Sequence, residues 1–123
     1  MNRVLVAEDN AVNRELMREM LEVFGCEVVE ASDGPEAIAR IDEAEPDLIL
    51  LDINMPKLNG FGVLRSIRQH PRFFARPVVA VTAYAMKEDR EKVLKAGFNG
   101  YLAKPVDGAL LLAELKRFGV VAG

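Results

Sequence analysis

Four short apolar segments of this chain each lead directly into charged or hydroxyl-bearing side chains. They are residues 4–7, followed by Glu8 and Asp9; residues 47–51, followed by Asp52; residues 78–81, followed by Thr82; and residues 100–103, followed by Lys104. Short apolar runs bounded by polar residues are typical of strands that are covered on both faces. In a parallel sheet the carboxyl ends of the strands meet along one edge, where ligands bind. We therefore expect three carboxylates, a hydroxyl and an ammonium group to gather at that edge.

Amphipathic segments separate these strands along the whole chain. A further strand is predicted at residues 27–31, and helical spacing of apolar residues follows every strand. Strands and helices that alternate through right-handed crossovers form a parallel sheet with helices on both faces. We predict a flavodoxin-like, doubly wound α/β fold, with five parallel strands in the order 2-1-3-4-5 and five helices. The 123 residues suffice for one core, so residues 1–123 are assigned to a single domain.

The helix expected after the first strand carries an apolar stripe at near-helical spacing. Its members are Val12, Leu16, Met20 and Phe24, widened by Met17 and Leu21. We expect the stripe to pack on the sheet, and core packing is preferred for Leu16. The alternative is that Val12 and Leu16 lie partly exposed beside the strand ends and form a docking patch. Two aromatic residues, Phe73 and Phe74, are expected to anchor the loop at 71–77 to the core.

Composition argues against several classes of function. The net charge is −3 and the isoelectric point is near 5.2, whereas a nucleic-acid surface would be basic. No apolar run reaches the roughly 20 residues that cross a bilayer, and residues 1–3 lead into a strand without a signal-peptide core. A single cysteine, Cys26, cannot form an internal disulfide, and with one histidine it argues against a thiolate zinc site. We expect a cytoplasmic protein that binds neither nucleic acid nor membranes directly.

Glu8, Asp9 and Asp52 follow two strands that are neighbours in the predicted order. Two carboxylates about 4 Å apart repel by about 4 kcal/mol at an effective dielectric constant of about 20, so such a cluster takes up protons or a cation. One acid at a strand end is most often simply solvated, but three of them with Lys104 on the same edge favour a cation site. Oxygen ligands of this kind suit Mg²⁺.

A divalent cation beside a carboxylate is suited to binding a phosphoryl group. Asp52 would act as the nucleophile and form an aspartyl phosphate, while Lys104 would neutralise a phosphoryl oxygen. Thr82 would donate a hydroxyl hydrogen bond, and Ala83 leaves space and offers its backbone N–H. No His, Ser or Cys stands where a general base or a hydrolytic triad would need one. The chain is therefore expected to be a phosphoacceptor and not an enzyme, although it would assist its own phosphorylation and dephosphorylation.

The motifs at these strand ends resemble those of response-regulator receiver domains from two-component signalling. They are Glu8-Asp9-Asn10; Leu51-Asp52-Ile53-Asn54-Met55-Pro56 with Gly60 beyond; Val81-Thr82-Ala83; and Lys104-Pro105. The resemblance covers residues 4–118, and its details are similar to DivK-type single-domain regulators and hybrid-kinase receivers. It implies that Asp52 is the phosphoacceptor. It also implies that Glu8, Asp9 and Asp52 hold Mg²⁺ together with the backbone carbonyl of Asn54.

The same resemblance implies a switch next to the phosphoacceptor. Thr82 and Lys104 would contact the phosphoryl group, and Tyr101 would rotate inward as Thr82 moves toward the phosphate. The Lys104–Pro105 bond is implied to be cis. Tyr84, two residues after Thr82, is expected to line the approach of water to the acyl phosphate and to slow its hydrolysis.

The partners implied are a phosphodonor and a downstream protein. The donor would be a histidine kinase or a histidine phosphotransfer protein, and the downstream partner would bind the helix at about 86–96, the strand at 100–103 and the final helix. The predicted function is a signalling switch controlled by phosphorylation. Two alternatives remain: a flavodoxin-like nucleotide-binding or small enzyme domain, and a receiver-like module that acts without phosphorylation. Against the first, Glu8-Asp9-Asn10 stands where a glycine-rich phosphate loop would be needed.

Overall fold

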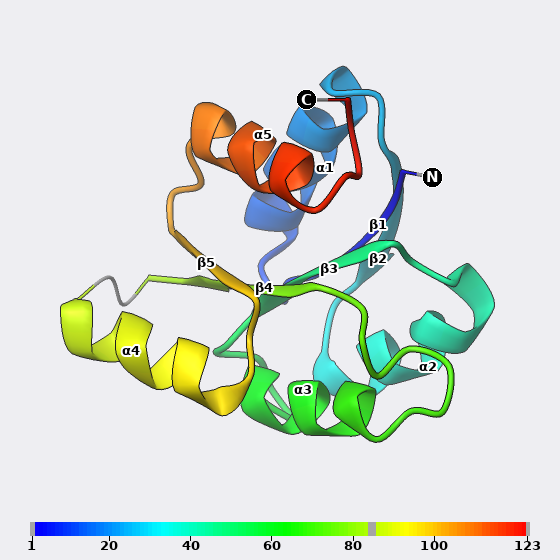
Figure 1. The fold of residues 1–123 in the computed structure, drawn as a ribbon, viewed down its shortest axis with the longest axis vertical. Coiled ribbons are helices and arrows are strands. Elements are labelled where there is room, and N and C mark those ends of the chain that lie inside the picture. The colour runs from blue at the N-terminus through cyan, green and yellow to red at the C-terminus, as the bar shows by residue number, and fades with distance from the viewer. Residues whose placement is uncertain (1, 84–85, 123) are drawn as a thin grey trace.

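The computed structural model describes residues 2–83 and 86–122 (Figure 1). Within these residues, strands and helices alternate along the chain. In order they are β1 (Arg3–Ala7), α1 (Ala11–Val23), β2 (Glu27–Ala31), α2 (Gly34–Ala44), β3 (Leu48–Asp52), α3 (Gly60–Arg68), β4 (Val78–Thr82), α4 (Lys87–Ala96), β5 (Gly100–Ala103) and α5 (Gly108–Arg117). The predicted alternation is confirmed.

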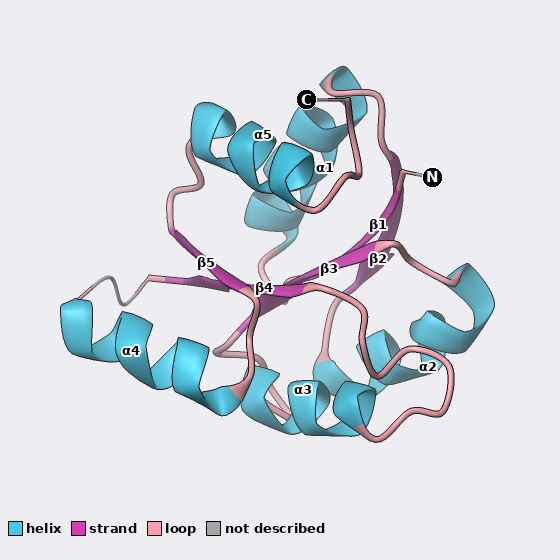
Figure 2. Ribbon diagram, viewed as in Figure 1, coloured by secondary structure: helices cyan, strands magenta, loops and turns pink. Residues whose placement is uncertain are grey.

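The strands form one parallel sheet in the predicted order, β2-β1-β3-β4-β5. Helices α1 and α5 cover one face of the sheet, and α2, α3 and α4 cover the other (Figure 2). The register aligns Ala7 with Leu51 and Asp52 with Val81, and β5 continues the same alignment. The residues that follow these strands therefore meet at one edge of the sheet.

Apolar side chains of the strands alternate between two cores, one on each face. Leu5 and Ile49 pack with residues of α2, α3 and α4, whereas Val4 and Leu48 pack with residues of α1 and α5. All residues of β3 are buried, as expected for a central strand covered on both faces. In the part of the chain that is described, none of the helices combines the length and apolarity needed to cross a membrane.

Short polar side chains begin the helices that follow the site loops. Asn10 caps α1 by accepting a hydrogen bond from the N–H of Asn13 at 2.9 Å. Asn59 caps α3 in the same way, accepting from the N–H of Gly62 at 3.1 Å. Such caps satisfy N–H groups that have no partner within the helix. They also set the points at which the β1–α1 and β3–α3 loops end.

The structure corrects the predicted packing of α1. Met17 and Leu21 are buried against the sheet, whereas Val12 is 65% exposed and Leu16 is 51% exposed. The predicted row lies about 100° around the helix axis from Met17 and Leu21. Its later members, Met20 and Phe24, are partly buried against the same core, so the row leaves the core only at its N-terminal end. The core position preferred for Leu16 was therefore wrong, and the exposed alternative holds for both Val12 and Leu16.

The loop after α3 buries only one of its two phenylalanines. Phe73 is buried, as predicted, but Phe74 is exposed, so the prediction for Phe74 was wrong. The side chains of adjacent residues in this turn point in different directions, and the ring of Phe73 lies against the guanidinium groups of Arg72 and Arg76, at 4.9 and 5.4 Å from its centroid.

Candidate functional site

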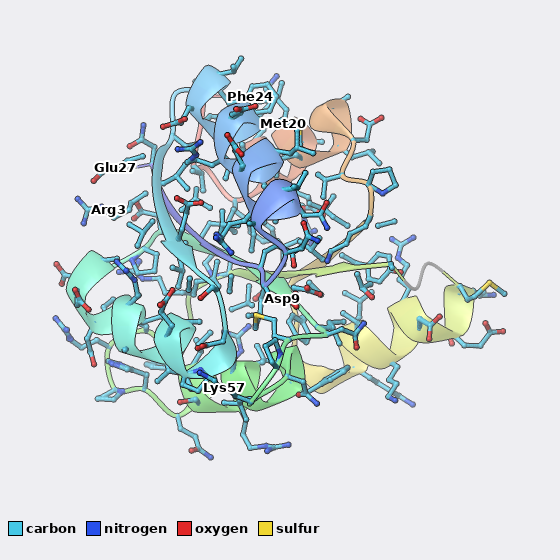
Figure 3. The ribbon with its side chains drawn as sticks, turned by 180° about the vertical axis from the view of Figure 1, so that it is seen from behind. Arg3, Asp9, Met20, Phe24, Glu27 and Lys57 are labelled. Atoms are coloured by element: carbon cyan, nitrogen blue, oxygen red, sulfur yellow. The ribbon has the colours of Figure 1, made fainter. Side chains whose placement is uncertain are left out.

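The strand ends bring Glu8, Asp9 and Asp52 together at the carboxyl edge of the sheet. One carboxylate oxygen from each residue lies within 4.8 Å of those from the other two. Glu8 is fully buried and Asp52 is 2% exposed. Asp9 is exposed at the junction of β1 and α1 (Figure 3). The sheet order therefore produces the expected convergence of these three acids.

Lys104 extends from the end of β5 to the two buried carboxylates. Its Nζ donates a hydrogen bond to Asp52 Oδ2 at 3.0 Å and lies 2.6 Å from Glu8 Oε1. The contact between Lys104 and Glu8 is an ion pair that lacks the geometry of a hydrogen bond. Glu8 Oε1 is therefore a buried oxygen that accepts no hydrogen bond from the described residues. Asp52 Oδ1 accepts a hydrogen bond from the N–H of Asn54 at 3.0 Å. One ammonium group thus serves two buried carboxylates, and Asp9 adds a third negative charge beside them.

The electrostatics of the cluster follow from this imbalance. Burial raises the pKa of the Glu8 carboxyl above its usual range, and Asp52 raises it further, while Lys104 partly opposes both effects. Burial by itself would lower the pKa of Lys104, but contacts with Glu8 and Asp52 outweigh it and hold that pKa above its usual range. Burial is thus the main cause of the Glu8 shift, and the ammonium group that Glu8 shares with Asp52 offsets only part of it.

Thr82, Ala83 and Pro105 flank the carboxylate cluster. Thr82 is buried at the end of β4, and its carbonyl oxygen accepts a hydrogen bond from the N–H of Lys104 at 2.8 Å. Ala83 follows it and is exposed. The Lys104–Pro105 peptide bond is cis in this structure. The Thr82 and Lys104 strand ends are therefore joined directly to one another beside Asp52.

Tyr101 lies farther along the same half of the sheet. Its side chain is half-buried on β5. Burial raises the pKa of the Tyr101 hydroxyl, and the carboxylate of Asp89 raises it further, against the opposing charge of Arg90. The tyrosine is thus electrostatically coupled to α4, the helix that follows Thr82 in the chain. Tyr84, for which a role in hydrolysis is predicted, lies outside the described residues.

The β3–α3 loop is held close to the carboxylates by its own contacts. The N–H of Gly60 donates to the carbonyl of Ile53 at 2.9 Å, and a Cβ at Gly60 would lie 2.8 Å from the carbonyl oxygen of Asp52. Lys57 adopts a positive φ of 70°, and its Nζ lies 3.2 Å from Asp33 Oδ2 at the start of α2. The Lys57–Asp33 contact was not anticipated, because no local pattern specifies that two segments 24 residues apart will meet.

The donor set fits a hard divalent cation. Three carboxylates converge, and buried Glu8 Oε1 has an ion pair with Lys104 but no hydrogen bond from the described residues. Mg²⁺ is bound in proteins by one or two carboxylates and retains several waters. The exposed position of Asp9 leaves one side of the cluster open to water. The residues present therefore suit Mg²⁺ in both charge and ligand type.

A family comparison decides what kind of domain carries this site. The chain matches the family model of the response regulator receiver domain over residues 4–116. The chain belongs to the receiver domain family. Receiver domains are the phosphoacceptor switches of two-component systems, so this is a signalling domain and not a conventional enzyme. The family assignment confirms the predicted function over the alternative of a nucleotide-binding or enzymatic flavodoxin-like domain.

The curated relatives of this receiver domain include a single-domain regulator and a hybrid kinase. The polar-differentiation response regulator DivK of Brucella anthropi is 35% identical over 115 residues, which are 94% of this chain and 94% of that protein. The hybrid signal transduction histidine kinase L of Dictyostelium discoideum is 36% identical, and the match covers 97% of this chain but 7% of the kinase. The predicted similarity to DivK-type regulators and hybrid-kinase receivers is confirmed.

Solved structures agree with this assignment. The receiver domain of a sensor histidine kinase from Pseudomonas aeruginosa is 38% identical with a TM-score of 0.87, and the match covers 95% of this chain and 96% of that one. The Vibrio cholerae chemotaxis protein CheY4 is 31% identical with a TM-score of 0.88, over 96% of this chain and 98% of that one. The Pseudomonas domain carries a magnesium ion coordinated in its active-site cleft.

Proposed function

We propose that this receiver domain, residues 1–123, accepts a phosphoryl group on Asp52 from the phosphohistidine of a histidine kinase or a histidine phosphotransfer protein. The observation that carries the proposal is the setting of the Asp52 carboxylate. It is almost fully buried, it accepts a hydrogen bond from Lys104 at 3.0 Å, and it lies in a cluster that suits a divalent cation. Among the described carboxylates of the cluster, Asp52 alone ends the central strand β3, in register with Val81, the residue before Thr82.

The chain supplies positioning and charge for the transfer. The donor's N–P bond breaks as an O–P bond forms at an Asp52 oxygen, and the departing imidazole takes the electron pair and gains a proton from solvent. Lys104 moves no proton; its ammonium neutralises a phosphoryl oxygen. The Thr82 hydroxyl and the Ala83 N–H donate hydrogen bonds to other phosphoryl oxygens.

Glu8, Asp9 and Asp52 would hold Mg²⁺, together with the backbone carbonyl of Asn54. When bound, the ion would offset the charge of the phosphoryl oxygens and of the carboxylates. The convergence of three carboxylates supports this assignment, because Lys104 pairs with two of them and a divalent cation would offset the negative charge that remains.

The donor is proposed to dock on α1 beside the site. Val12 and Leu16 are exposed on this helix, and a cavity of about 60 Å³ lies between it and the loop after β5, lined by Leu16, Met20, Lys104 and Val106. Figure 3 shows Met20 and Phe24 along α1 above Asp9. An apolar patch next to a carboxylate site suits the helix of a protein donor, whose histidine must reach Asp52.

Output is proposed to pass through α4, β5 and α5 to a downstream protein in the cytoplasm. Phosphorylation would draw Thr82 toward the phosphate and let Tyr101 turn inward, which shifts a two-state equilibrium of this face. A depression on the same face is lined by Arg90, Tyr101, Leu110 and Arg117, which gives a partner both charged and apolar contacts.

The test is labelling with acetyl phosphate in the presence of Mg²⁺, followed by intact-mass measurement. One phosphate should be added to the wild-type chain and none to Asp52→Ala. Asp9→Asn serves as the matched control, because it keeps the phosphoacceptor and should label slowly. Labelling of Asp52→Ala at the wild-type level would contradict the assignment of the phosphoacceptor.

A further inference from the structure

Arg14 of α1 makes a contact with the end of β1 that the proposed phosphotransfer does not use. Its Nη1 donates a hydrogen bond to the backbone carbonyl of Glu8 at 2.9 Å. Its Nε lies 3.4 Å from Oε1 of Glu30 on the edge strand β2. The Arg14 side chain is only 22% exposed, so the guanidinium is partly enclosed between α1, β1 and β2.

The carbonyl held by Arg14 belongs to the peptide unit that joins Glu8 to Asp9. A peptide unit is planar, so fixing its oxygen also fixes the direction of its N–H and the position at which Asp9 begins. On the other side of Glu8, the preceding peptide unit is also held, because the N–H of Glu8 donates to the carbonyl of Ala31 at 3.0 Å. The N–H of Asn10 donates to Glu8 Oε2 at 3.3 Å. The backbone of Glu8 is thus held by β2 on one side and by α1 on the other, and its side chain is held by the N–H of Asn10.

We propose that Arg14 is a positioning residue for the divalent cation site. It holds the Glu8–Asp9 peptide so that these two carboxylates converge with Asp52, and Glu30 orients its guanidinium. The inference rests on the cation site of the proposed function. Arg14 also lies on α1 between Val12 and Leu16, so the helix proposed to receive the donor is tied to the backbone of Glu8, a member of the carboxylate cluster.

The sign of the change in Mg²⁺ affinity when Arg14 is replaced distinguishes a positioning role from a purely electrostatic one. Arg14 carries a positive charge close to an acidic cluster, so its removal would tighten Mg²⁺ binding if charge alone mattered. Loss of positioning would weaken Mg²⁺ binding, because Asp9 would no longer be held within reach of Asp52. Residues that orient metal ligands typically contribute about 10-fold or more to metal affinity.

The experiment measures Mg²⁺ affinity of the full chain by isothermal titration calorimetry for the wild type, Arg14→Met, Arg14→Lys and Arg18→Met. Arg14→Met should bind Mg²⁺ about 10-fold more weakly than the wild type. Arg14→Lys should fall between them, because an ammonium group reaches one of the two partners but lacks the fork of the guanidinium. Arg18→Met is the matched control, since it removes a charge one turn farther along α1, where Arg18 pairs with Glu15 at 3.7 Å.

Urea unfolding in EDTA accompanies each titration and shows whether a variant is folded. If Arg14→Met does not fold, Arg14→Lys and Glu30→Gln carry the test, and wild-type affinity in both would overturn the inference. If the wild type binds Mg²⁺ and Arg14→Met binds it equally or more tightly, that result by itself would overturn the role of Arg14 and leave the cation site standing. A wild-type chain that binds no Mg²⁺ would overturn the cation site of the proposed function, and the role of Arg14 with it.

Discussion

Replacement of Asp9 by Asn is expected to stabilise the metal-free protein and to remove most of its response to Mg²⁺. Asp9 is the exposed member of a cluster of three carboxylates, of which the other two, Glu8 and Asp52, pair with the ammonium group of Lys104. Asn has nearly the same shape as Asp but no charge, so the substitution changes the electrostatics of the cluster with little change in packing. The same substitution removes one of the proposed ligands.

The expected gain follows from the distances in the cluster. An oxygen of Asp9 lies within 4.8 Å of oxygens of both Glu8 and Asp52. At that separation two unit charges repel by about 3.5 kcal/mol at an effective dielectric constant of 20, and by about 1 kcal/mol in bulk water. Lys104 neutralises one of the two buried carboxylates, so Asp9 is repelled by the charge of one carboxylate. Because Asp9 is exposed, the screening of this repulsion lies between the two limits. We expect the free energy of unfolding in EDTA to rise by about 1–2 kcal/mol.

The assay is urea unfolding at low ionic strength, in EDTA and in Mg²⁺. At a Mg²⁺ concentration about 100 times the dissociation constant, the wild type should gain about 2.7 kcal/mol. Asp9→Asn should gain much less stability from Mg²⁺. The difference in free energy of unfolding between the two proteins should therefore be smaller in Mg²⁺ than in EDTA, or change sign. Glu19→Gln is the control, because it removes an exposed carboxylate of α1 that lies outside the cluster. Lower stability of Asp9→Asn in EDTA, or equal Mg²⁺ stabilisation of both proteins, would contradict the predicted repulsion.

Four further substitutions test side-chain packing, the cap of α5 and the burial of Cys26. Leu21→Ala removes a fully buried side chain and should cost about 2–5 kcal/mol in urea unfolding, whereas Leu16→Ala, on the exposed row of α1, should stay within about 0.5 kcal/mol. Asp107→Ala removes the cap that accepts from the N–H groups of Ala109 and Leu110, and should cost about 1 kcal/mol in the same assay. Burial raises the pKa of the Cys26 thiol above its ordinary value of 9.0. The unfolded chain therefore loses this proton at a lower pH than the folded one, and stability should fall as the pH rises above 9.0. Unfolding curves on both sides of that pH should show a smaller fall for Cys26→Ala, and equal falls would contradict the shift.

The sheet and its strand order were predictable because each strand can be recognised from its local sequence. β3 is buried throughout and apolar up to its last residue, Asp52, and polar residues mark where each strand ends. Once strand order is known, register follows from the shared edge, so the meeting of Glu8, Asp9 and Asp52 was also predictable. Tyr84, by contrast, lies outside the described residues, and its role in hydrolysis stays a prediction.

The rotation of α1 was not predictable from its pattern. The stripe from Val12 to Phe24 is wide enough to allow two orientations, and hydrophobicity alone favours neither. Packing against the sheet selects Met17 and Leu21, which leaves Val12 and Leu16 exposed beside the site. The surface proposed for donor docking is therefore a consequence of how the helix sits on the sheet.

The amino-acid sequence alone determined which segments form strands and where each strand ends, because apolar runs and polar termini are local properties. The alternation of strands and helices then indicated the strand order, and with it the acids that share an edge. Only the folded chain decided that Lys104 contacts both buried carboxylates, and that Arg14 and Lys57 tie the site loops to β2 and α2. These contacts join residues distant in the chain through long, flexible side chains. Their formation depends on helix rotation and loop docking, which are set by packing across the whole domain.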